Sequence, residues 1–270
     1  RDADRIIVVG DGRIVADEKP DKLLCMDVLE KEGIREPLYI TALKHAGCQV
    51  EAKSLPQHIE TMDLKPYQEK VQAWFQKAPL PPARPAGEAA LEVKGLEFSY
   101  VPGKPVLRDI NFRVGKGEIM SIVGKNGAGK STLSSLICGF HRPTKGAILL
   151  NGQDLSDKSI KERGEVIGLV MQNPNQMISK PMIFDEVALG LAVRGVPEEE
   201  IKERVYETLK ICGLYPFRNW PVSALSFGQK KRMTIASILV MNPEILILDE
   251  PTAGQDYRHY TEIMEFLKKI

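Results

Sequence analysis

The stretch GKNGAGKS at residues 124–131 decides the fold that this sequence predicts. It fits the pattern G-x-x-x-x-G-K-[ST], in which glycines let backbone N–H groups converge on phosphate oxygens. The apolar run EIMSIV at 118–123 predicts a strand before it, and a helix is expected to start near Lys130. The N-terminus of such a helix adds about half a positive charge. This order of strand, glycine loop and helix predicts a phosphate-binding loop and disfavours the alternative of a purely structural glycine turn.

Two side chains of this loop predict what it binds. Lys130 is placed to reach the β- and γ-phosphates of a nucleotide, and the Ser131 hydroxyl is placed to ligate Mg²⁺. We therefore expect ATP and Mg²⁺ as the cofactors. The residues expected to bind ATP in the loop and the first helical turn are Gly124, Asn126, Gly127, Gly129, Lys130, Ser131 and Thr132.

A second acidic motif, ILILDE at residues 245–250, predicts the rest of the site. Its consecutive apolar residues are typical of a central strand that is buried on both faces. Such a strand would deliver Asp249 to its carboxyl end, beside the phosphate loop, where it can hold Mg²⁺ through water. Glu250 would then accept a proton from the attacking water. The alternative is a strand that ends in two ordinary surface acids.

Composition and charge exclude several other classes of protein. The 270 residues are 43% apolar and 27% charged, which excludes wholesale disorder. A net charge of +1 leaves no field that would hold a polyanion, so phosphate recognition must be local. The four cysteines contain no CxxC pair, so they indicate neither a zinc knuckle nor a disulfide scaffold. No apolar run approaches the roughly 18 residues that a membrane span requires.

A third motif, LSFGQ at residues 225–229, precedes an apolar helix. Taken alone it predicts a helix capped by Ser226 and followed by basic residues. Together with the other two motifs it resembles the LSGGQ signature of the ABC ATPases, in which GKNGAGKS is similar to the Walker A loop and ILILDE to the Walker B strand. The resemblance covers about residues 91–270. It implies an α/β fold of the P-loop NTPase type, with a largely parallel sheet, an antiparallel β subdomain and a helical signature subdomain.

The same resemblance gives roles to residues outside the phosphate motifs. Gln172 resembles the Q-loop glutamine, which contacts Mg²⁺ or the attacking water and couples to the transmembrane partner. Tyr100 stands where the family has an aromatic that stacks on adenine, although a tyrosine in the core of a strand is the alternative. Asp256 resembles the D-loop aspartate at the dimer interface. The resemblance thus implies catalytic residues Glu250, Gln172 and Lys130, Mg²⁺ ligands Ser131, Gln172 and Asp249, and signature residues Ser226, Gly228 and Gln229.

Two departures from the family pattern bear on activity. Phe227 replaces the first glycine of the signature, a segment that caps the γ-phosphate of the opposite domain in the family. Its bulky ring is expected to weaken the composite site. The switch histidine, which follows the D-loop in the family, would lie beyond Ile270. We therefore expect this chain by itself to bind ATP better than it hydrolyses it.

The resemblance also predicts how the chain is organised. Residues 3–16 resemble the segment after the switch histidine, so residues 1–31 are expected to be the C-terminal remnant of a first cassette. Residues 32–88 would connect two cassettes and end in the Pro-rich linker APLPPARPAG at 78–87. Residues 89–270 would form the second nucleotide-binding domain, truncated before the switch histidine.

Tandem cassettes with QNPN at 172–175 and FDEVALG at 184–190 resemble the energising subunits of energy-coupling-factor vitamin importers. The bridge REPLYITALKH at 35–45, before the linker, is similar to that of the fused subunit assigned to thiamine or its precursor. The resemblance implies a transport-coupled ATPase that energises import of a small molecule, such as thiamine or its hydroxymethylpyrimidine precursor, through a separate membrane subunit. The implied partners are membrane-embedded transporter subunits and a second ABC cassette, in the same polypeptide or in a dimer mate, with no specific nucleic acid. The implied location is peripheral, on the cytoplasmic face of the cell membrane.

Two other functions stay open at this point. One is a soluble tandem-cassette ATPase that acts on ribosomes or nucleic acid, which stimulation of the ATPase by RNA would favour. The other is a purely regulatory nucleotide-binding module, which Phe227 suggests. A Glu250→Gln variant that hydrolyses ATP at the unaltered rate would favour the regulatory module.

Overall fold

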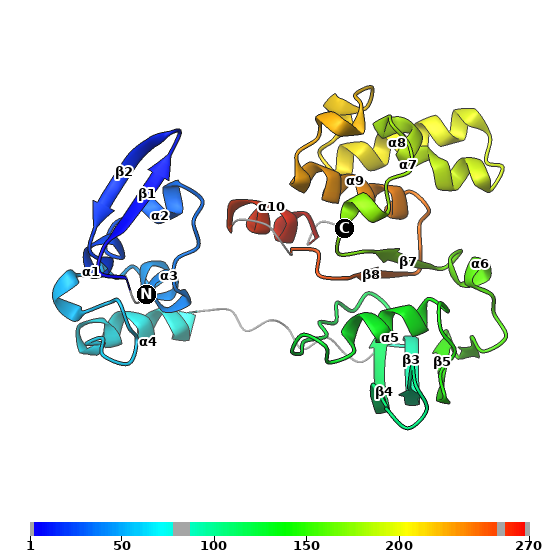
Figure 1. Cartoon of the computed structure of the whole chain (residues 1–270), viewed down its shortest axis with the longest axis horizontal. Coiled ribbons are helices and arrows are strands. Elements are labelled where there is room, and N and C mark those ends of the chain that lie inside the picture. The colour runs from blue at the N-terminus through cyan, green and yellow to red at the C-terminus, as the bar shows by residue number, and fades with distance from the viewer. Residues whose placement is uncertain (1–2, 78–86, 253–256, 268–270) are drawn as a thin grey trace. The chain divides into compact units, whose positions relative to one another are not determined.

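The computed structural model describes residues 3–77, 87–252 and 257–267 (Figure 1). The chain divides into two compact units, which are Arg1–Ala83 with Gly254–Glu262 and Arg84–Ala253 with Ile263–Ile270. Nearly all of the Pro-rich stretch predicted to be a linker lies outside the described residues. The two units are therefore considered separately.

The first unit starts with a β-hairpin and continues as short helices. Strands β1 (Ile6–Gly10) and β2 (Arg13–Glu18) pair antiparallel around a turn in which Asp11 and Gly12 have φ values of 48° and 74°. The helices that follow are α1 (Pro20–Leu23), α2 (Val28–Lys31), α3 (Leu38–His45) and α4 (Gln68–Lys77), with 3₁₀ turns at Ala52–Ser54 and Lys65–Tyr67.

Residues 21–31 do not form a single helix. The structure has two one-turn helices there, α1 and α2, with Asp27 as the N-cap of the second. Leu23 and Leu29 are both buried in the same core. At 100° per residue a straight helix would turn these two side chains about 120° apart, so the break lets both pack inward.

One hydrophobic core joins the hairpin to the helices of the first unit. It crosses the predicted division at residue 31, because it contains Val8 and Leu23 on one side and Ile40, Leu43 and Tyr67 on the other. The Tyr67 hydroxyl also lies 2.9 Å from the Ser54 hydroxyl. Residues 3–77 thus fold together, and the assignment of residues 1–31 to a preceding cassette stays a prediction.

The second unit contains a four-stranded antiparallel sheet. Its strands are β3 (Ala89–Phe98), β4 (Leu107–Gly115), β5 (Lys145–Leu150) and β6 (Gln153–Asp154), in the order β4-β3-β5-β6. Helix α5 (Lys130–Ile137) follows the phosphate-loop motif and packs Leu133 and Leu136 into the core that β3 and β5 share. The short helix α6 (Ile160–Arg163) lies between β6 and the next strand. The predicted antiparallel β subdomain is therefore present.

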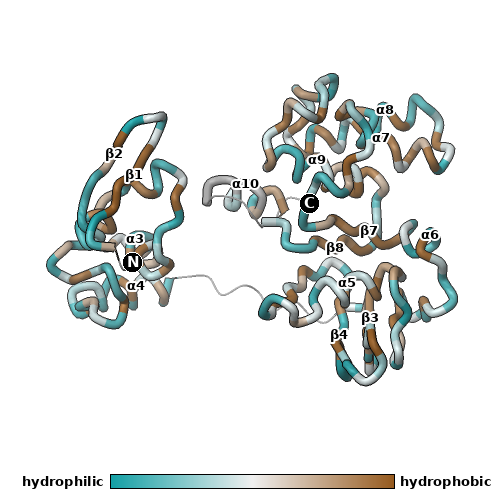
Figure 2. Tube along the Cα trace, viewed as in Figure 1, coloured by the Kyte–Doolittle hydropathy of each residue, from teal (hydrophilic) through white to brown (hydrophobic). Residues whose placement is uncertain are grey.

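The parallel part of the structure is the strand pair β7 (Ile167–Val170) and β8 (Ile245–Leu248), which Figure 2 shows as strongly hydrophobic. Their register aligns Ile167 with Ile245 and Val170 with Leu248. Every residue of β8 is half-buried rather than buried on both faces as predicted. The physical reason is that, among the described residues, only β7 pairs with this strand.

The predicted strand at 118–123 is wrong for a related reason. Residues 119–125 form no strand, and Ile119 and Val123 are 76% and 88% exposed. A parallel strand must bond its backbone groups to a neighbouring strand, and no strand in the described ranges pairs with this run. The apolar sequence alone is therefore not sufficient to make it a strand.

A helical subdomain covers the parallel pair. It consists of α7 (Ile183–Val193), α8 (Glu198–Ile211) and α9 (Phe227–Leu239), with 3₁₀ turns at Pro174–Gln176, Tyr215–Phe217 and Val222–Ala224. Helix α8 buries an apolar stripe, in which Val205 and Leu209 are 0% exposed. Helix α7 passes so close to the end of α9 that a β-carbon at Gly190 would lie 2.6 Å from Sδ of Met241. The core of this subdomain is thus tightly packed.

The last described element is α10 (Tyr257–Leu267), in which Phe266 is buried in the core of the helical subdomain. Asp256, predicted to be the D-loop aspartate, lies outside the described residues. In the described ranges every helix is too short or too polar to cross a bilayer.

Candidate nucleotide-binding site

The glycine loop at 124–131 adopts a backbone that its glycines permit. Gly127 and Gly129 have φ values of 80° and 94°, and Gly129 is the N-cap of α5. A β-carbon at Gly129 would lie 2.7 Å from Cδ2 of Leu107, so a larger residue would clash there. A β-carbon at Gly127 would meet nothing within 4 Å, so the loop leaves open space above this residue. Such a loop fits a phosphate group held by N–H groups at the start of a helix.

The ammonium group of Lys130 is held over this loop. Its Nζ donates to the carbonyl oxygens of Gly124 and Lys125 at 3.0 and 3.2 Å, and it lies 3.9 Å from Oε1 of Glu250. Two loop carbonyls therefore orient the cation toward the end of β8. This position makes it available to a phosphate oxygen between the loop and the carboxylate.

Ser131 and Asp249 meet although they are 118 residues apart in the sequence. The Ser131 Oγ lies 3.3 Å from Oδ1 of Asp249, whose backbone N–H donates to the carbonyl of Val170 at 2.9 Å. A hydroxyl and a carboxylate are hard oxygen donors of the kind that Mg²⁺ prefers. In the described ranges no group of three or more His, Cys, Asp or Glu side chains is arranged so that it could hold a metal ion. The donor set thus fits Mg²⁺ that is completed by water and phosphate rather than by an all-protein cage.

Gln172 and Glu250 form a second pair at the same edge of the parallel strands. The Gln172 Nε2 donates to Oε2 of Glu250 at 2.8 Å. Glu250 has a φ of 45°, in the left-handed region that residues other than glycine adopt rarely. The structure thus brings together Lys130, Ser131, Gln172, Asp249 and Glu250.

Tyr100 lies next to the first turn of α5. Its hydroxyl is 3.1 Å from Oγ1 of Thr132, and the residue is 56% exposed, so it is not a core residue. The ring contacts Phe98 and His141 edge-on, with centroids 4.8 and 5.3 Å apart. An exposed ring beside the phosphate loop can stack on a base. The sequence analysis missed His141, because a single histidine after a helix has no spacing that marks it.

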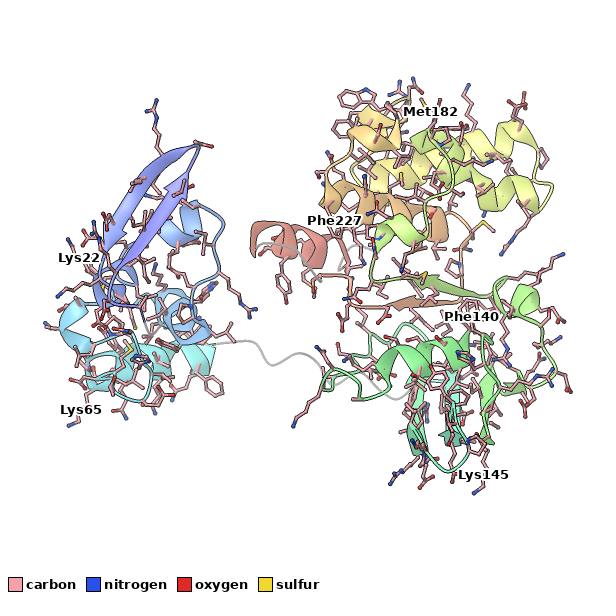
Figure 3. The ribbon with its side chains drawn as sticks, viewed as in Figure 1. Lys22, Lys65, Phe140, Lys145, Met182 and Phe227 are labelled. Carbon is pink, nitrogen blue, oxygen red and sulfur yellow. The ribbon has the colours of Figure 1, made fainter. Side chains whose placement is uncertain are left out.

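Among the residues predicted to form the signature, Ser226 and Gln229 cap α9, and Gly228 lies in its first turn. The Gln229 N–H donates to Ser226 Oγ at 3.3 Å, and the Ser226 N–H donates to Gln229 Oε1 at 2.9 Å. These bonds stay inside the first turn of α9, and the contacts of Lys130 described above involve none of these residues. Phe227 extends from the start of the helix and is 42% exposed (Figure 3).

Three buried charged residues outside the motifs were missed by the sequence analysis. Lys231 donates to the carbonyls of Met171 and Gln172 at 2.8 and 2.6 Å. Glu186 accepts the backbone N–H groups of Ser179 and Lys180 at 2.8 and 2.6 Å, and so it fixes the segment before α7. No sequence signal distinguishes them from ordinary helical surface charges.

The third of these residues, Arg163, supports the phosphate-loop helix from its far end. Its guanidinium donates to the carbonyls of Leu136 and Ile137, at the C-terminus of α5, at 3.0 and 3.1 Å. Burial lowers the pKa of Arg163 from its ordinary value. A cation at the C-terminus of a helix stabilises its dipole, so Arg163 helps to hold α5 in place.

Comparison with known proteins agrees with this geometry. Residues 107–253 match a family model described as ABC transporter. This chain belongs to the ABC transporter family of ATP-binding proteins. Residues 26–98 match a second model, described as ATP-binding cassette cobalt transporter. The P-loop NTPase fold, the antiparallel β subdomain and the helical subdomain predicted from the sequence are thereby confirmed.

Relatives of this cassette protein match along its whole length. It is 58% identical over 269 residues to a protein of Clostridium perfringens named as an ABC transporter ATP-binding protein, covering 100% of this chain and 47% of the relative. It is 52% identical over 270 residues to a similarly named protein of Vibrio parahaemolyticus, again covering 100% and 47%. The chain thus spans about half the length of the curated relatives it matches.

Two solved structures are similar to the cassette. One is cbiO1 from Clostridium perfringens, part of the ABC transporter complex cbiONQ, with a TM-score of 0.63 and 40% identity over 67% of this chain and 72% of that chain. The other is an ATP-binding cassette solved as a dimer in a post-hydrolysis state with ADP and Pi. Its TM-score is 0.58, with 31% identity over 66% of this chain and 82% of that chain.

Proposed function

We propose that this chain binds and hydrolyses ATP as part of an ABC importer, and that it energises passage of a small molecule through a separate membrane subunit. The observation that carries the proposal is the convergence of Lys130, Ser131, Gln172, Asp249 and Glu250 at one end of β7 and β8. A phosphate loop that only bound nucleotide would need neither the hydrogen bond between Gln172 and Glu250 nor the approach of Glu250 to Lys130. The site therefore supports hydrolysis as well as binding.

In this proposal the glycine loop binds the phosphates of ATP through its backbone N–H groups. Residues Gly124, Asn126, Gly127, Gly129 and Thr132 line the phosphates, and Lys130 leaves its two loop carbonyls to bind the β- and γ-phosphate oxygens. Tyr100 stacks on the adenine from its place beside Thr132. Ser131 and Asp249 hold Mg²⁺, with Gln172 as a further ligand. Mg²⁺ in such a site neutralises charge that develops on the phosphates.

Glu250 and Gln172 would act on the attacking water. Glu250 lies within 3.9 Å of Lys130, so its carboxylate faces the position of the terminal phosphate. It accepts a proton from the water as the water attacks. Gln172 donates to Oε2 of Glu250 and so orients the carboxylate and the water. These roles make Glu250, Gln172 and Lys130 the catalytic residues.

A second cassette completes the site in this proposal. The segment from Ser226 to Gln229 is the capped start of α9, where Ser226 and Phe227 are exposed, which suits contact with ATP that is bound to another copy of the domain. Asp256 would lie at the same interface. The cassette model matches this chain once, at 107–253, and each relative has about as much sequence again outside the match. The mate is therefore either another part of a longer polypeptide or a separate subunit.

The proposed membrane partner places the protein at the cytoplasmic face of the cell membrane, as a peripheral subunit. Support comes from the similarity to cbiO1, which is part of the complex cbiONQ. Two observations bear on which compound is transported. The resemblance of the segment before the linker favours thiamine or its hydroxymethylpyrimidine precursor, whereas the description of the family matched over 26–98 favours cobalt.

Copurification tests the transport function. The complete protein is expressed with its candidate membrane subunits, solubilised in detergent and purified through a tag on a membrane subunit. We expect the ATPase to copurify and its rate to depend on the membrane subunit. A protein that never associates, with an ATPase that no membrane subunit affects, contradicts the transport function. Uptake of labelled thiamine, hydroxymethylpyrimidine and Co²⁺ in vesicles then separates the substrates.

A further inference from the structure

Lys231 in α9 is the most completely buried charged residue in the described part of the chain. Its exposure is 0%, while the buried Glu186, Arg163 and Glu36 keep between 4% and 7%. It follows the N-cap Ser226 by little more than one helical turn. Lys231 therefore lies behind the signature turn, inside the protein.

The partners of its ammonium group are backbone carbonyls rather than carboxylates. Nζ donates to the carbonyl oxygens of Met171 and Gln172 at 2.8 and 2.6 Å. Burial lowers the pKa of Lys231 more than the nearby charges of Asp249 and Glu250 raise it. A buried cation without a contacting carboxylate costs free energy, so packing alone does not explain the choice of lysine at this position.

The backbone that Lys231 holds is the part that carries Gln172. Strand β7 ends at Val170, so Met171 and Gln172 are the first residues to leave the sheet. The carbonyl of Gln172 accepts from Lys231, and its side-chain amide donates to Glu250 at 2.8 Å. One residue thus connects the buried lysine on α9 to the carboxylate after β8.

We propose that Lys231 is a positioning residue that sets the placement of Gln172 against Glu250 by holding the Gln172 backbone to the start of the signature helix. The inference rests on the proposed function, because it assigns Lys231 a part in ATP hydrolysis at Glu250. When the exposed turn around Phe227 engages ATP on another cassette, a movement of α9 displaces Lys231 and with it Gln172. Contact of the signature turn with ATP on the other cassette thereby changes the position of Gln172 relative to Glu250 in this chain.

A purely structural lysine would behave differently. If Lys231 only fixed α9 to the end of β7, its loss would lower stability and would weaken ATP binding and hydrolysis together. A positioning residue instead lowers kcat and leaves the affinity for ATP nearly unchanged, because the phosphate loop around Lys130 is not altered. The split between binding and turnover therefore separates the two roles.

The test uses the complete protein with its membrane partners. Lys231→Met keeps a side chain of similar length and removes the donors. We expect kcat to fall by about tenfold or more while the Kd for Mg-ATP stays within about twofold. Lys231→Gln retains two N–H donors and should recover most of the rate.

A double-mutant cycle shows whether Lys231 acts through Gln172. In a Gln172→Ala background, Lys231→Met should lower kcat no further. The matched control is Arg204→Met, because Arg204 donates to the carbonyl of Val240 at the other end of the same helix, at 2.7 Å. This control should leave kcat within about twofold.

Each other outcome has a defined meaning. The inference is overturned if the losses from Lys231→Met and Gln172→Ala multiply, or if Lys231→Met has no more effect than Arg204→Met. If Lys231→Met does not fold, the cycle is run with Lys231→Ala, which also removes the donors, and any loss of kcat that persists in Gln172→Ala overturns the inference. An inactive unmutated protein would instead contradict the proposed function.

Discussion

The side-chain amide of Gln172 donates a 2.8 Å hydrogen bond to Oε2 of Glu250, across 78 positions of sequence. The contact follows from strand pairing, because Val170 and Leu248 are in register at the ends of β7 and β8. Residues that follow the carboxyl ends of paired parallel strands emerge at the same edge. The proposed catalytic pair is thus placed by the sheet, whereas the phosphate loop is placed by α5.

Removing the carboxylate of Glu250 should separate hydrolysis from binding. In the complete protein, Glu250→Gln should reduce the ATPase rate by about 10²- to 10⁴-fold, because a general base contributes on that order. The affinity for Mg-ATP should change by less than about twofold, since the loop around Lys130 is intact. Phosphate release and equilibrium nucleotide binding measure the two quantities.

The control for this change lies at the other end of the same strand. Glu244 immediately precedes β8 and accepts from Nδ2 of Asn151 at 2.6 Å, away from the phosphate loop. Glu244→Gln should leave the rate within about twofold. If Glu250→Gln hydrolyses ATP as fast as the unmutated protein, Glu250 is not the base and a regulatory nucleotide-binding role gains support.

The pair Ser131 and Asp249 should determine the Mg²⁺ requirement. Ser131→Ala and Asp249→Asn should each raise the Mg²⁺ concentration for half-maximal ATPase by at least about tenfold, a loss seen even for outer-shell partners of a metal. A magnesium titration at saturating ATP checks this. Ser135→Ala is the matched control, since the Ser135 hydroxyl donates to the Ser131 carbonyl at 2.8 Å and does not reach Asp249. An equal shift in all three variants would contradict the metal role.

Tyr100 should contribute to binding of the base and not of the phosphates. Tyr100→Ala should weaken ATP binding by about tenfold, because stacking on an aromatic ring contributes about 1–3 kcal/mol per base. Tyr100→Phe keeps the ring, loses only the contact with Thr132, and should bind nearly as well. Competition by tripolyphosphate, which has no base, should be unaffected by either change. A loss of tripolyphosphate binding in Tyr100→Ala would show that the residue supports the loop instead.

Two buried thiols should make stability depend on alkaline pH. Burial raises the pKa of Cys138 to about 11 and that of Cys212 to about 12, from an ordinary value of 9.0. Below pH 9 both thiols are protonated in the folded and the unfolded states, and stability is unaffected. Above pH 9 the unfolded chain loses the protons first, so the free energy of unfolding falls as pH rises toward 11 and 12. Between pH 8 and 10 the loss is about 3 kcal/mol for the two groups.

Urea unfolding of the second unit, followed in the complete protein at several pH values, measures this slope. The control is the variant with both Cys138→Ala and Cys212→Ala, which should be less stable at pH 8 but lose less stability on going to pH 10. Equal slopes in the two proteins would contradict the thiol origin. The same burial predicts that neither thiol reacts with iodoacetamide at pH 8 until the protein unfolds.

Much of the fold could be predicted from local sequence. The helix after the phosphate loop, the stripe of α8 and the cap of α9 all depend on residues close in sequence, and the structure has each of them. The run at 118–123 was mispredicted because apolar composition does not supply a neighbouring strand. Residues 46–77, polar and without strong periodicity, gave no sign that Tyr67 and Met62 would close a core.

The residues of the candidate site likewise fall into those that the sequence could predict and those that it could not. Residues that follow a strand or open a helix, such as Lys130, Asp249 and Gln172, could be found from motifs, and the structure brings them together. Lys231 could not be found, because its neighbours Lys230 and Arg232 make it look like part of a solvated basic turn. Its burial depends on β7, about sixty residues earlier. Only the tertiary arrangement reveals that dependence.

At Glu250 the left-handed backbone lowers the stability of the fold, while the carboxylate of the same residue is the proposed base for ATP hydrolysis. A φ of 45° disfavours any residue with a β-carbon by about 1 kcal/mol, and glycine would remove that strain. A redesign that chose residues by backbone preference alone would therefore place glycine there and produce a sturdier cassette that no longer consumes ATP.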